Sequence, residues 1–310
     1  MKSERENYTI LINTIVDEYV NTPDKEKSLT RLQEKYGVKR KVIASNLNRR
    51  GIKIINNKSP RINEEIFDCI DTEEKAYWLG FIYADGCNQL DKHVFSINLS
   101  AKDIDHLEKL KDFLQIQNNV SKYMVYDKYE MCRLYVTNTH FTEQLNLLGC
   151  TPRKSLTLVF PDENIFKEKN LIYDFIRGYF DGDGSIAMYI KKGCKTSEVS
   201  VVGTQSFLQK VQSFLGIDGF IKNKSYAGHH NNAFELKYSN FKARQVARLL
   251  YENSSVYMVR KYKIFEEFCR FEEESLRAKS SKISRRWDAN TEVTSEITKG
   301  SEAPQRVEGE

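Results

Sequence analysis

The chain has 310 residues, of which 40% are hydrophobic and 29% are charged, a composition typical of a soluble globular protein of one or two domains. No apolar run approaches the roughly 18 to 20 residues needed to cross a bilayer. Residues 1–10 lack the apolar core of a signal peptide, so we expect a cytoplasmic protein without a membrane partner. The six cysteines form no C-x-x-C pair, which disfavours a zinc or redox site and favours reduced thiols.

Positive charge is concentrated in residues 1–60, which hold thirteen Lys or Arg against seven Asp or Glu, although the whole chain has a net charge of only +5. Clustered positive charge is typical of a protein that binds a polyanion. Apolar periodicity predicts a supporting helix over residues 7–20, followed by two short helices. Their apolar faces are formed by Leu29, Leu32 and Tyr36 and by Val42, Ile43 and Leu47. Gly37 lies between them, where a tight turn requires a residue that tolerates positive φ.

Two short helices joined in this way are typical of a helix-turn-helix domain. The second helix carries basic and amide side chains outside its apolar stripe, and such side chains contact phosphates and base edges in a DNA major groove. They are Lys39, Arg40, Lys41, Asn46, Arg49 and Arg50. A plain three-helix bundle with a basic surface is the alternative.

An internal repeat organises residues 71–270. Two apolar segments of helical length, residues 74–86 and 173–184, both end in Asp-Gly, and Gly80 and Gly178 are spaced as Asp85 and Asp183 are. Strand-like alternation follows each segment, over 93–100 and 129–138 in the first half and over 198–204 and 232–240 in the second. Helical stretches separate and close these runs, at 102–116, 140–149, 206–216 and 241–250. The sequence therefore predicts an α-β-β-α-β-β-α unit used twice.

Each motif helix ends in an aspartate, where the partial negative charge of unpaired carbonyls disfavours a carboxylate by roughly 0.3–1 kcal/mol. Two such choices at matched positions predict a compensating cation. Mg²⁺ prefers hard oxygen ligands, which the carboxylates of Asp85 and Asp183 and the carbonyls of Ala84 and Gly182 would supply. Gly86 and Gly184 would let the chain turn sharply out of each helix. Two aspartates, divalent metal and a phosphate make a site for phosphodiester hydrolysis.

The absence of side chains at Gly80 and Gly178 lets the two motif helices pack closely, which would bring both aspartates to one end of their interface. One Asp-Gly pair after a buried helix is more often only the start of a turn. Two copies at one spacing favour a functional site instead.

The segments WLGFIYADG (78–86) and IRGYFDGDG (176–184) resemble the two signature motifs of the single-chain LAGLIDADG homing endonucleases. The resemblance covers about residues 71–270. It implies an α+β fold in which the motif helices form a pseudo-twofold interface between two αββαββα halves, each laying an antiparallel sheet in the DNA major groove. It also implies Mg²⁺ at Asp85 and Asp183, with Mn²⁺ able to substitute, and double-strand cleavage that leaves short 3′ overhangs.

Further residue roles follow from the same resemblance. Basic residues that assist cleavage match Lys154 and Lys261, and Gln205 matches a polar residue that positions water. The first half departs from the pattern near Ala101 and Lys102, so the counterpart of Gln205 is left unassigned. The usually acidic sixth motif position is Tyr83 in the first copy and Asp181 in the second. The two active sites are therefore expected to differ in composition.

The alternating strands indicate hydrogen-bonding faces that can contact base edges. The candidate DNA-binding side chains are Ser96, Asn98 and Ser100 in one run, Arg133, Tyr135 and Thr137 in the next, and Lys237 and Ser239 in the second half. A solvated sheet face gives the same alternation, so the pattern acquires meaning only beside the two motifs.

We expect a helix-turn-helix domain at 1–60, a linker at 61–73, a first half at 74–155, a second half at 156–275 and a disordered tail at 276–310. The predicted function is a monomeric, site-specific double-strand DNA endonuclease with a long asymmetric target, encoded by an intron or an independently inserted mobile gene. The alternatives are a regulator of the same fold without catalysis and an RNA maturase for a group I intron.

Overall fold

The computed structural model describes residues 2–23, 28–54, 62–117, 119–224 and 232–277. The chain divides into two compact units, Met1–Arg61 and Ile62–Glu310. Most of the expected tail, residues 278–310, lies outside the described residues. No helix within the described ranges is long and apolar enough to span a membrane.

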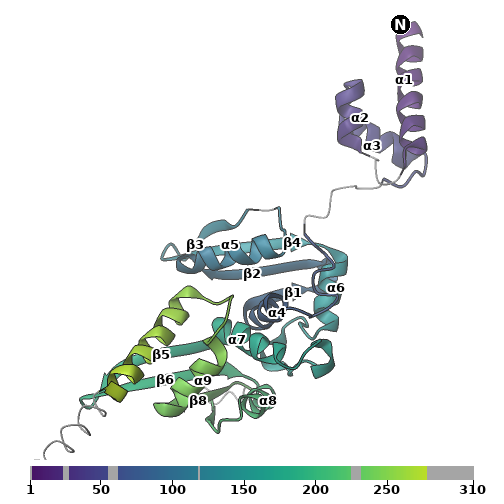
Figure 1. The fold of residues 1–310 in the computed structure, drawn as a ribbon. Coiled ribbons are helices and arrows are strands. Elements are labelled where there is room, and N and C mark those ends of the chain that lie inside the picture. The colour runs from purple at the N-terminus through teal and green to yellow at the C-terminus, as the bar shows by residue number, and fades with distance from the viewer. Residues whose placement is uncertain (1, 24–27, 55–61, 118, 225–231, 278–310) are drawn as a thin grey trace, which may run out of the picture. The chain divides into compact units, whose positions relative to one another are not determined.

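The N-terminal unit consists of α1 (Lys2–Asn21), α2 (Leu29–Tyr36) and α3 (Arg40–Arg49) (Figure 1). The Ser28 hydroxyl caps α2 by accepting a hydrogen bond from the backbone N–H of Arg31 at 3.2 Å. Gly37 ends α2 with a φ of +67°, as the sequence predicts for this turn. Leu32, Ile43 and Leu47 are buried between the helices, which confirms the predicted apolar faces.

The second unit contains the predicted αββαββα order twice. The first half is α4 (Glu73–Asp85), β1 (Gly86–Gln89), β2 (Val94–Ser100), α5 (Ile104–Phe113), β3 (Ser121–Val125), β4 (Tyr129–Thr137) and α6 (Thr139–Leu147). The second half is α7 (Leu171–Asp183), β5 (Gly184–Lys191), β6 (Cys194–Gly203), α8 (Gln205–Leu215), β7 (Phe220–Asn223), β8 (Phe234–Ser239) and α9 (Phe241–Tyr251). The predicted α+β fold of two similar halves is confirmed.

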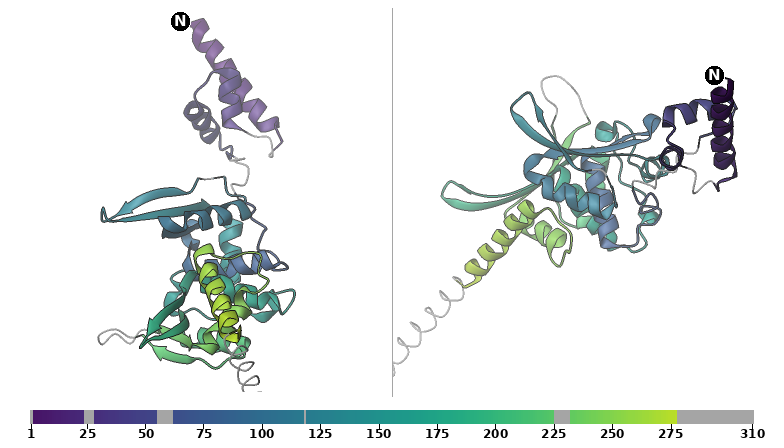
Figure 2. Two further views of the ribbon diagram at one scale, coloured as in Figure 1. Left: turned by 60° about the vertical axis from the view of Figure 1, so that its left-hand side comes forward. Right: turned by 90° about the horizontal axis from the view of Figure 1, so that it is seen from above.

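Each half folds its four strands into one antiparallel sheet, in the orders β1-β2-β4-β3 and β5-β6-β8-β7. The registers correspond, because Gly86 pairs with Ile97 in the first sheet as Gly184 pairs with Val201 in the second. Helices cover the apolar face of each sheet, and the long hairpins extend to the same side of the helical body (Figure 2, right). The opposite face of each sheet is left uncovered by these helices.

The residues before α4 belong to the core rather than to a linker. Residues 61–73 are expected from the sequence to form a linker, but Ile62, Ile66, Phe67 and Ile70 are buried in the core of the second unit. These side chains recur at intervals of about four residues, so one apolar side of the segment packs into this core. The second unit therefore begins at residue 62.

A helix over residues 259–277 follows α9 and was not predicted. It is held against α9 by Glu272, whose carboxylate accepts hydrogen bonds from Arg244 at 2.8 Å and from Arg248 at 2.8 and 3.0 Å. The helix extends past residue 276, where the expected disordered tail was to begin. Its first turns carry Lys261 to the end of α7.

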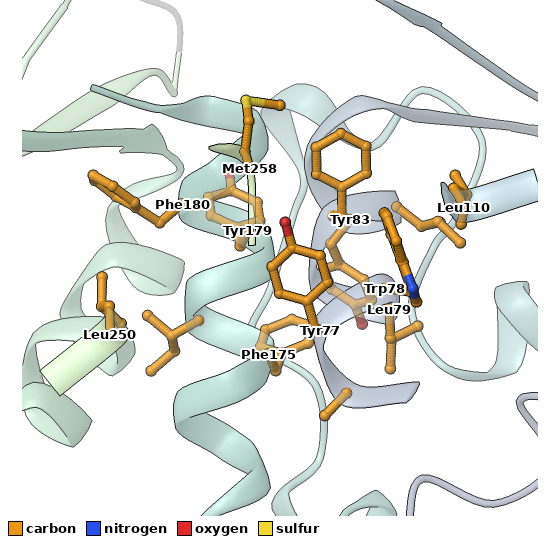
Figure 3. Packing of buried hydrophobic residues seen from close by; sticks show 14 of the residues in the cluster. Tyr77, Trp78, Leu79, Tyr83, Leu110, Phe175, Tyr179, Phe180, Leu250 and Met258 are labelled. Carbon is orange, nitrogen blue, oxygen red and sulfur yellow. The ribbon is translucent and has the colours of Figure 1, made fainter. Parts of the chain in front are cut away.

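The two motif helices, α4 and α7, pack in direct backbone contact at the centre of the second unit. A Cβ atom on Gly80 would overlap the carbonyl oxygen of Phe175, and one on Gly178 would overlap that of Tyr77. Aromatic side chains surround this contact, among them Tyr77, Phe175 and Tyr179 (Figure 3). Gly80 and Gly178 therefore lie where the backbones of the two motif helices come into contact.

Candidate active site

The last residues of α4 and α7 are Asp85 and Asp183. The two carboxylates lie at the same end of the helix interface, because a Cβ on Gly182 of α7 would lie only 3.0 Å from Oδ2 of Asp85. The side chain of Ala84 lies closer still and would overlap a Cβ on Gly182. Close packing at the glycines therefore places both motif aspartates in one location, as expected.

The surroundings of the two carboxylates disfavour their charged forms. Desolvation raises the pKa of Asp85 to about 6, and the neighbouring charge of Asp183 adds to this effect. Desolvation also raises the pKa of Asp183, which the Tyr179 hydroxyl opposes. Two acids that share a poorly solvated location in this way are suited to bind a divalent cation.

Lys154 contacts the end of the first motif helix. It lies in a short 3₁₀ segment, Lys154–Leu156, directly after a left-handed Arg153, and its side chain is buried. Its ammonium group donates to the carbonyl of Gly86 at 2.5 Å and, at 3.4 Å, to that of Ala84. The resemblance matched this lysine to the site, and the structure brings it there.

Lys261 occupies the corresponding place at the end of α7. Its ammonium group donates to the carbonyls of Phe180 at 2.6 Å, Asp181 at 2.9 Å and Gly184 at 2.5 Å. Desolvation lowers the pKa of Lys261 to about 8, although the charge of Asp181 opposes this shift. Both helix ends therefore carry a buried lysine.

These lysines offset the helix dipole that disfavours an aspartate at a helix C-terminus. The sequence alone predicts a metal as the compensating cation. In the structure, the ammonium groups of Lys154 and Lys261 already place positive charge on the terminal carbonyls of α4 and α7. What still favours a divalent cation is the pair of neighbouring carboxylates, not the helix ends themselves.

Gly86 and Gly184 are required by space rather than by backbone conformation. Their φ values are −71° and −93°, which any residue can adopt. A Cβ on Gly86 would lie 2.5 Å from the carbonyl oxygen of Ile82, and one on Gly184 would overlap the Phe180 side chain. Each glycine thus lets the first strand of its half start directly against the helix that precedes it.

A cavity of about 230 Å³ opens beside Asp183. It lies at the junction of the two halves, because Tyr83, Ala84 and Lys154 line it from the first half and Tyr179 and Asp183 from the second. A phosphate group in this cavity would lie close to a lysine ammonium and a carboxylate together.

The proposed oxygen ligands fit a divalent cation in part. The carboxylates of Asp85 and Asp183 can both act as metal ligands. The predicted ligand of Gly182 is its backbone carbonyl, and the carbonyl of Ala84 already accepts a long hydrogen bond from Lys154. No cluster of three or more His, Cys, Asp or Glu suited to a metal occurs among the described residues. Mg²⁺ commonly uses one or two carboxylates together with substrate phosphate and water, and the two aspartates match that arrangement.

Gln205 lies apart from this cavity. It is the first residue of α8, its side chain is exposed, and the nearby cavity wall is formed instead by Val202 and Gly203. Its expected role in positioning water therefore remains a prediction.

The sixth motif position differs between the halves. Asp181 is fully buried and accepts hydrogen bonds from Tyr77 at 2.7 Å, Tyr251 at 2.5 Å and the backbone N–H of Met258 at 2.7 Å. At the equivalent position Tyr83 donates to the carbonyl of Leu148. The sequence showed this difference, but the hydroxyl partners of Asp181 come from distant segments that no local spacing reveals.

The uncovered face of the first sheet carries six of the eight strand residues predicted to contact DNA. Asn98, Ser100, Tyr135 and Thr137 are exposed there, and the Arg133 guanidinium lies 5.4 Å from the Tyr135 ring centroid. Ser96 differs, because it is only 2% exposed between neighbouring strands. Its hydroxyl is therefore not accessible to a base edge in this structure.

The corresponding face of the second sheet is more highly charged. Lys237 and Ser239 lie there as predicted, and Lys237 forms an ion pair with Glu198 at 2.6 Å. A second ion pair joins Glu235 to Lys224 at 3.2 Å. Glu235 belongs to the strand face predicted from the sequence, whereas the carboxylate of Glu198 was not among the predicted contacts.

The basic side chains of the N-terminal unit divide between the two short helices. In α2, Arg31 and Lys35 both pair with Glu18 of α1, at 3.3 and 2.7 Å. At α3 the predicted contact residues are Lys39, Arg40, Lys41, Arg49 and Arg50, which are exposed, and Asn46, which is half-buried. Arg50 donates to the side-chain oxygen of Asn13 at 2.6 Å. The positive charge of α3 therefore faces solvent.

No protein-family model matches the sequence, and no curated protein matches it significantly. Among solved structures, the I-SmaMI LAGLIDADG homing endonuclease bound to cleaved DNA is 16% identical over 63% of this chain and 87% of its own, with a TM-score of 0.43. The I-LtrWI LAGLIDADG homing endonuclease bound to target DNA is 12% identical over 65% of this chain and 92% of its own, with a TM-score of 0.44.

Proposed function

We propose that the protein is a site-specific DNA endonuclease that hydrolyses one phosphodiester in each strand of its target. The observation that carries the proposal is the meeting of Asp85 and Asp183 at one end of the α4–α7 interface, beside two buried lysines. The motifs that form this interface resemble those of LAGLIDADG homing endonucleases. Mg²⁺, or Mn²⁺ in its place, would be held by the two carboxylates and would polarise the phosphate and activate water.

The chain's own residues would position the DNA and stabilise developing charge. Lys154 and Lys261 hold the helix ends in place and supply positive potential beside the cavity, where a phosphate gains charge during hydrolysis. Gln205 would orient water in the second half, with no counterpart assigned in the first. Because Tyr83 and Asp181 differ in charge, the two strands would be cut by unequal sites.

Binding would use both units of the chain. The uncovered sheet faces present donors and acceptors from alternate residues of each strand, a pattern suited to the major groove. The solvent-facing charge of α3 and the turn at Gly37 support a helix-turn-helix that adds contacts beyond those of the sheets. We infer a monomer with a long asymmetric target and short 3′ overhangs, encoded by an intron or another mobile element.

Cleavage selection tests this function directly. A library of randomised duplexes is incubated with the full-length protein and Mg²⁺, and cut ends are sequenced to give the target and the overhang together. Recovery of one long asymmetric site with short 3′ overhangs supports the proposal. Binding without cutting would favour a regulator, and preference for intron RNA in competition would favour a maturase.

The aspartates are tested by Asp85→Asn. This variant keeps the shape of the side chain and removes one of two charges in a poorly solvated location, so it should fold and bind DNA while cleavage is lost. Asp103→Asn is a matched control, because Asp103 pairs with exposed Arg260 at 2.9 Å outside the cavity. Mg²⁺-dependent cutting of both strands by Asp85→Asn at the normal rate would contradict the assignment.

A further inference from the structure

The uncovered face of the second sheet holds an ion pair that has no equivalent among the described residues on the uncovered face of the first sheet. Lys237 Nζ lies 2.6 Å from Glu198 Oε2, and the Tyr189 hydroxyl donates to the same oxygen at 2.9 Å. The three residues come from β8, β6 and β5, so they form a row across the sheet. The side chains of Lys237 and Glu198 are 38% and 25% exposed, so solvent reaches both ends of the pair.

The strand registers show what stands at the equivalent place in the first sheet. In the second sheet Ser200 pairs with Lys237, and at the equivalent place in the first sheet Ser96 pairs with Tyr135. Two residues further along, Glu198 pairs with Ser239, and its equivalent Val94 pairs with Thr137. Lys237 therefore corresponds to Tyr135, and Glu198 corresponds to Val94. An ammonium and a carboxylate in one half replace a phenol and an isopropyl group in the other.

The chemistry of a G·C pair matches the ion pair. In the major groove guanine presents the N7 and O6 acceptors beside the N4 donor of cytosine, and lysine and glutamate are the side chains that contact these two edges. Hydrogen bonds from Lys237 and Tyr189 lower the pKa of Glu198 in spite of its partial burial, so the carboxylate is charged and can accept. Tyr189 fixes its position.

We propose that Lys237 and Glu198 together recognise one G·C base pair in the half-site that lies under the second sheet. Lys237 donates to guanine while Glu198 accepts from cytosine N4. The equivalent position of the other half-site carries no such requirement, because Tyr135 and Val94 cannot make this pair of contacts. The inference rests on the proposed binding of duplex DNA by the sheets.

The test compares base preferences of the wild-type protein with those of Glu198→Gln and of the double variant Glu198→Val, Lys237→Tyr in a binding selection with randomised duplexes. Wild type should require G·C at one position of one half-site. Glu198→Gln should reduce discrimination there by about tenfold to a hundredfold. The double variant carries the first half's residues and should take on the preference found at the equivalent position of the other half-site.

Glu130→Gln is the control. Glu130 lies on β4 among residues that alternate toward the opposite face, and it pairs only weakly with Lys122, at 4.0 Å. The base preferences of Glu130→Gln should equal those of wild type. Circular dichroism verifies the folding of each variant, and Glu198→Gln keeps the test valid if the double variant does not fold, since it changes no side-chain volume.

Two failures are distinguishable. If wild type selects no duplex sequence, the proposed function and this inference fall together. If wild type selects a target but Glu198→Gln leaves every base preference unchanged, or alters all positions equally, the inference alone is wrong.

Discussion

Replacing Gly80 with alanine tests the backbone contact on which the candidate site depends. The added Cβ would overlap the carbonyl oxygen of Phe175 and would lie 2.9 Å from both the Phe175 carbonyl carbon and the Tyr179 nitrogen, instead of the 3.4 to 4 Å of an ordinary contact. These are backbone atoms of α7, which no side-chain rotation can move aside. Relief therefore requires α4 and α7 to separate.

The expected loss of stability is about 2 kcal/mol. Overpacking of a well-packed interior costs roughly 1–3 kcal/mol, and backbone atoms on the opposing side place Gly80→Ala at the upper end. Alanine recovers up to about 1 kcal/mol through its better helix propensity. The catalytic effect is larger, because a displacement of about 1 Å at reacting groups can reduce the rate by roughly a hundredfold.

Stability is measured by urea denaturation followed through fluorescence of Trp78, which is buried in α4. Trp287 is replaced by phenylalanine in every variant so that only Trp78 reports on the second unit. Cleavage is measured on the selected target and expressed per folded molecule. Gly178→Ala should behave in the same way, since its Cβ would overlap the Tyr77 carbonyl oxygen.

Gly216→Ala is the matched control. Gly216 ends α8 with a φ of +63° and has open space where a Cβ would be, so alanine there costs about 1–2 kcal/mol through backbone strain alone. It should lower stability without changing cleavage per folded molecule. If Gly80→Ala is as stable and as active as wild type, α4 and α7 do not pack through these glycines and the reasoning is refuted.

Two other substitutions test charge–charge and hydrogen-bond contacts. Hydrogen bonds from Lys35 and then Tyr36 hold the pKa of Glu18 at about 2, below its ordinary 4.5. The stabilisation that the charged Glu18 carboxylate gives to the N-terminal unit is therefore complete above pH 4.5 and is lost as the pH falls toward 2; amide NMR signals of α1 and α2 should show this loss in wild type but not in Glu18→Gln. Asp181→Asn should destabilise the second unit by about 2–3 kcal/mol in urea, since an amide NH₂ would face one of three hydrogen-bond donors; unchanged stability would show that the network contributes nothing.

Local sequence signals were sufficient for the elements that carry strong periodicity. The motif helices, the strands β2, β4, β6 and β8 and the helices that follow them were all located, because each has an apolar face at the spacing of its structure. The strands β1, β3, β5 and β7 were not located. Of these, β1, β3 and β7 span only four or five residues, too few for alternation to identify, whereas β5 (Gly184–Lys191) is longer and was also missed. The segment 62–70 was assigned to a linker because it lies between the first domain and the first motif helix, although Ile62, Ile66, Phe67 and Ile70 are buried in the core.

The site was predictable in its acids but not in its supporting contacts. The repeated Asp-Gly placed Asp85 and Asp183, and close helix packing followed from Gly80 and Gly178. The contacts of the Lys261 ammonium with carbonyls about 80 residues earlier, and the hydroxyls that surround Asp181, depend on the tertiary fold. Without these contacts, the helix dipole predicted only a metal as the cation beside each aspartate.

Replacing Lys261 should lower the stability of the second unit more than replacing Lys154, because the two lysines have different partners. Lys154 donates to two carbonyls, one of them at 3.4 Å, whereas Lys261 donates to three and is the cation that acts on buried Asp181. Lys261→Met would leave that carboxylate without its charge partner, at a cost of about 3–5 kcal/mol. Lys154→Met removes two charge-assisted hydrogen bonds and one cation beside the partly buried Asp85 and Asp183, at a cost of about 1.5–3 kcal/mol.

The unequal contacts of the two lysines also predict that each lysine substitution slows the cutting of the two DNA strands unequally. A target with a different label on each strand reports the two cuts separately. Cleavage is measured without urea, at a temperature where both variants remain folded, so that unfolding does not contribute to the rates. Each lysine holds the end of the helix that carries one aspartate, so each substitution should slow the cutting of one strand more than the other, and the affected strand should be opposite in the two variants. Equal slowing of both strands by both variants would mean that the lysines act on a single shared centre, and the assignment of one lysine to each half would be wrong.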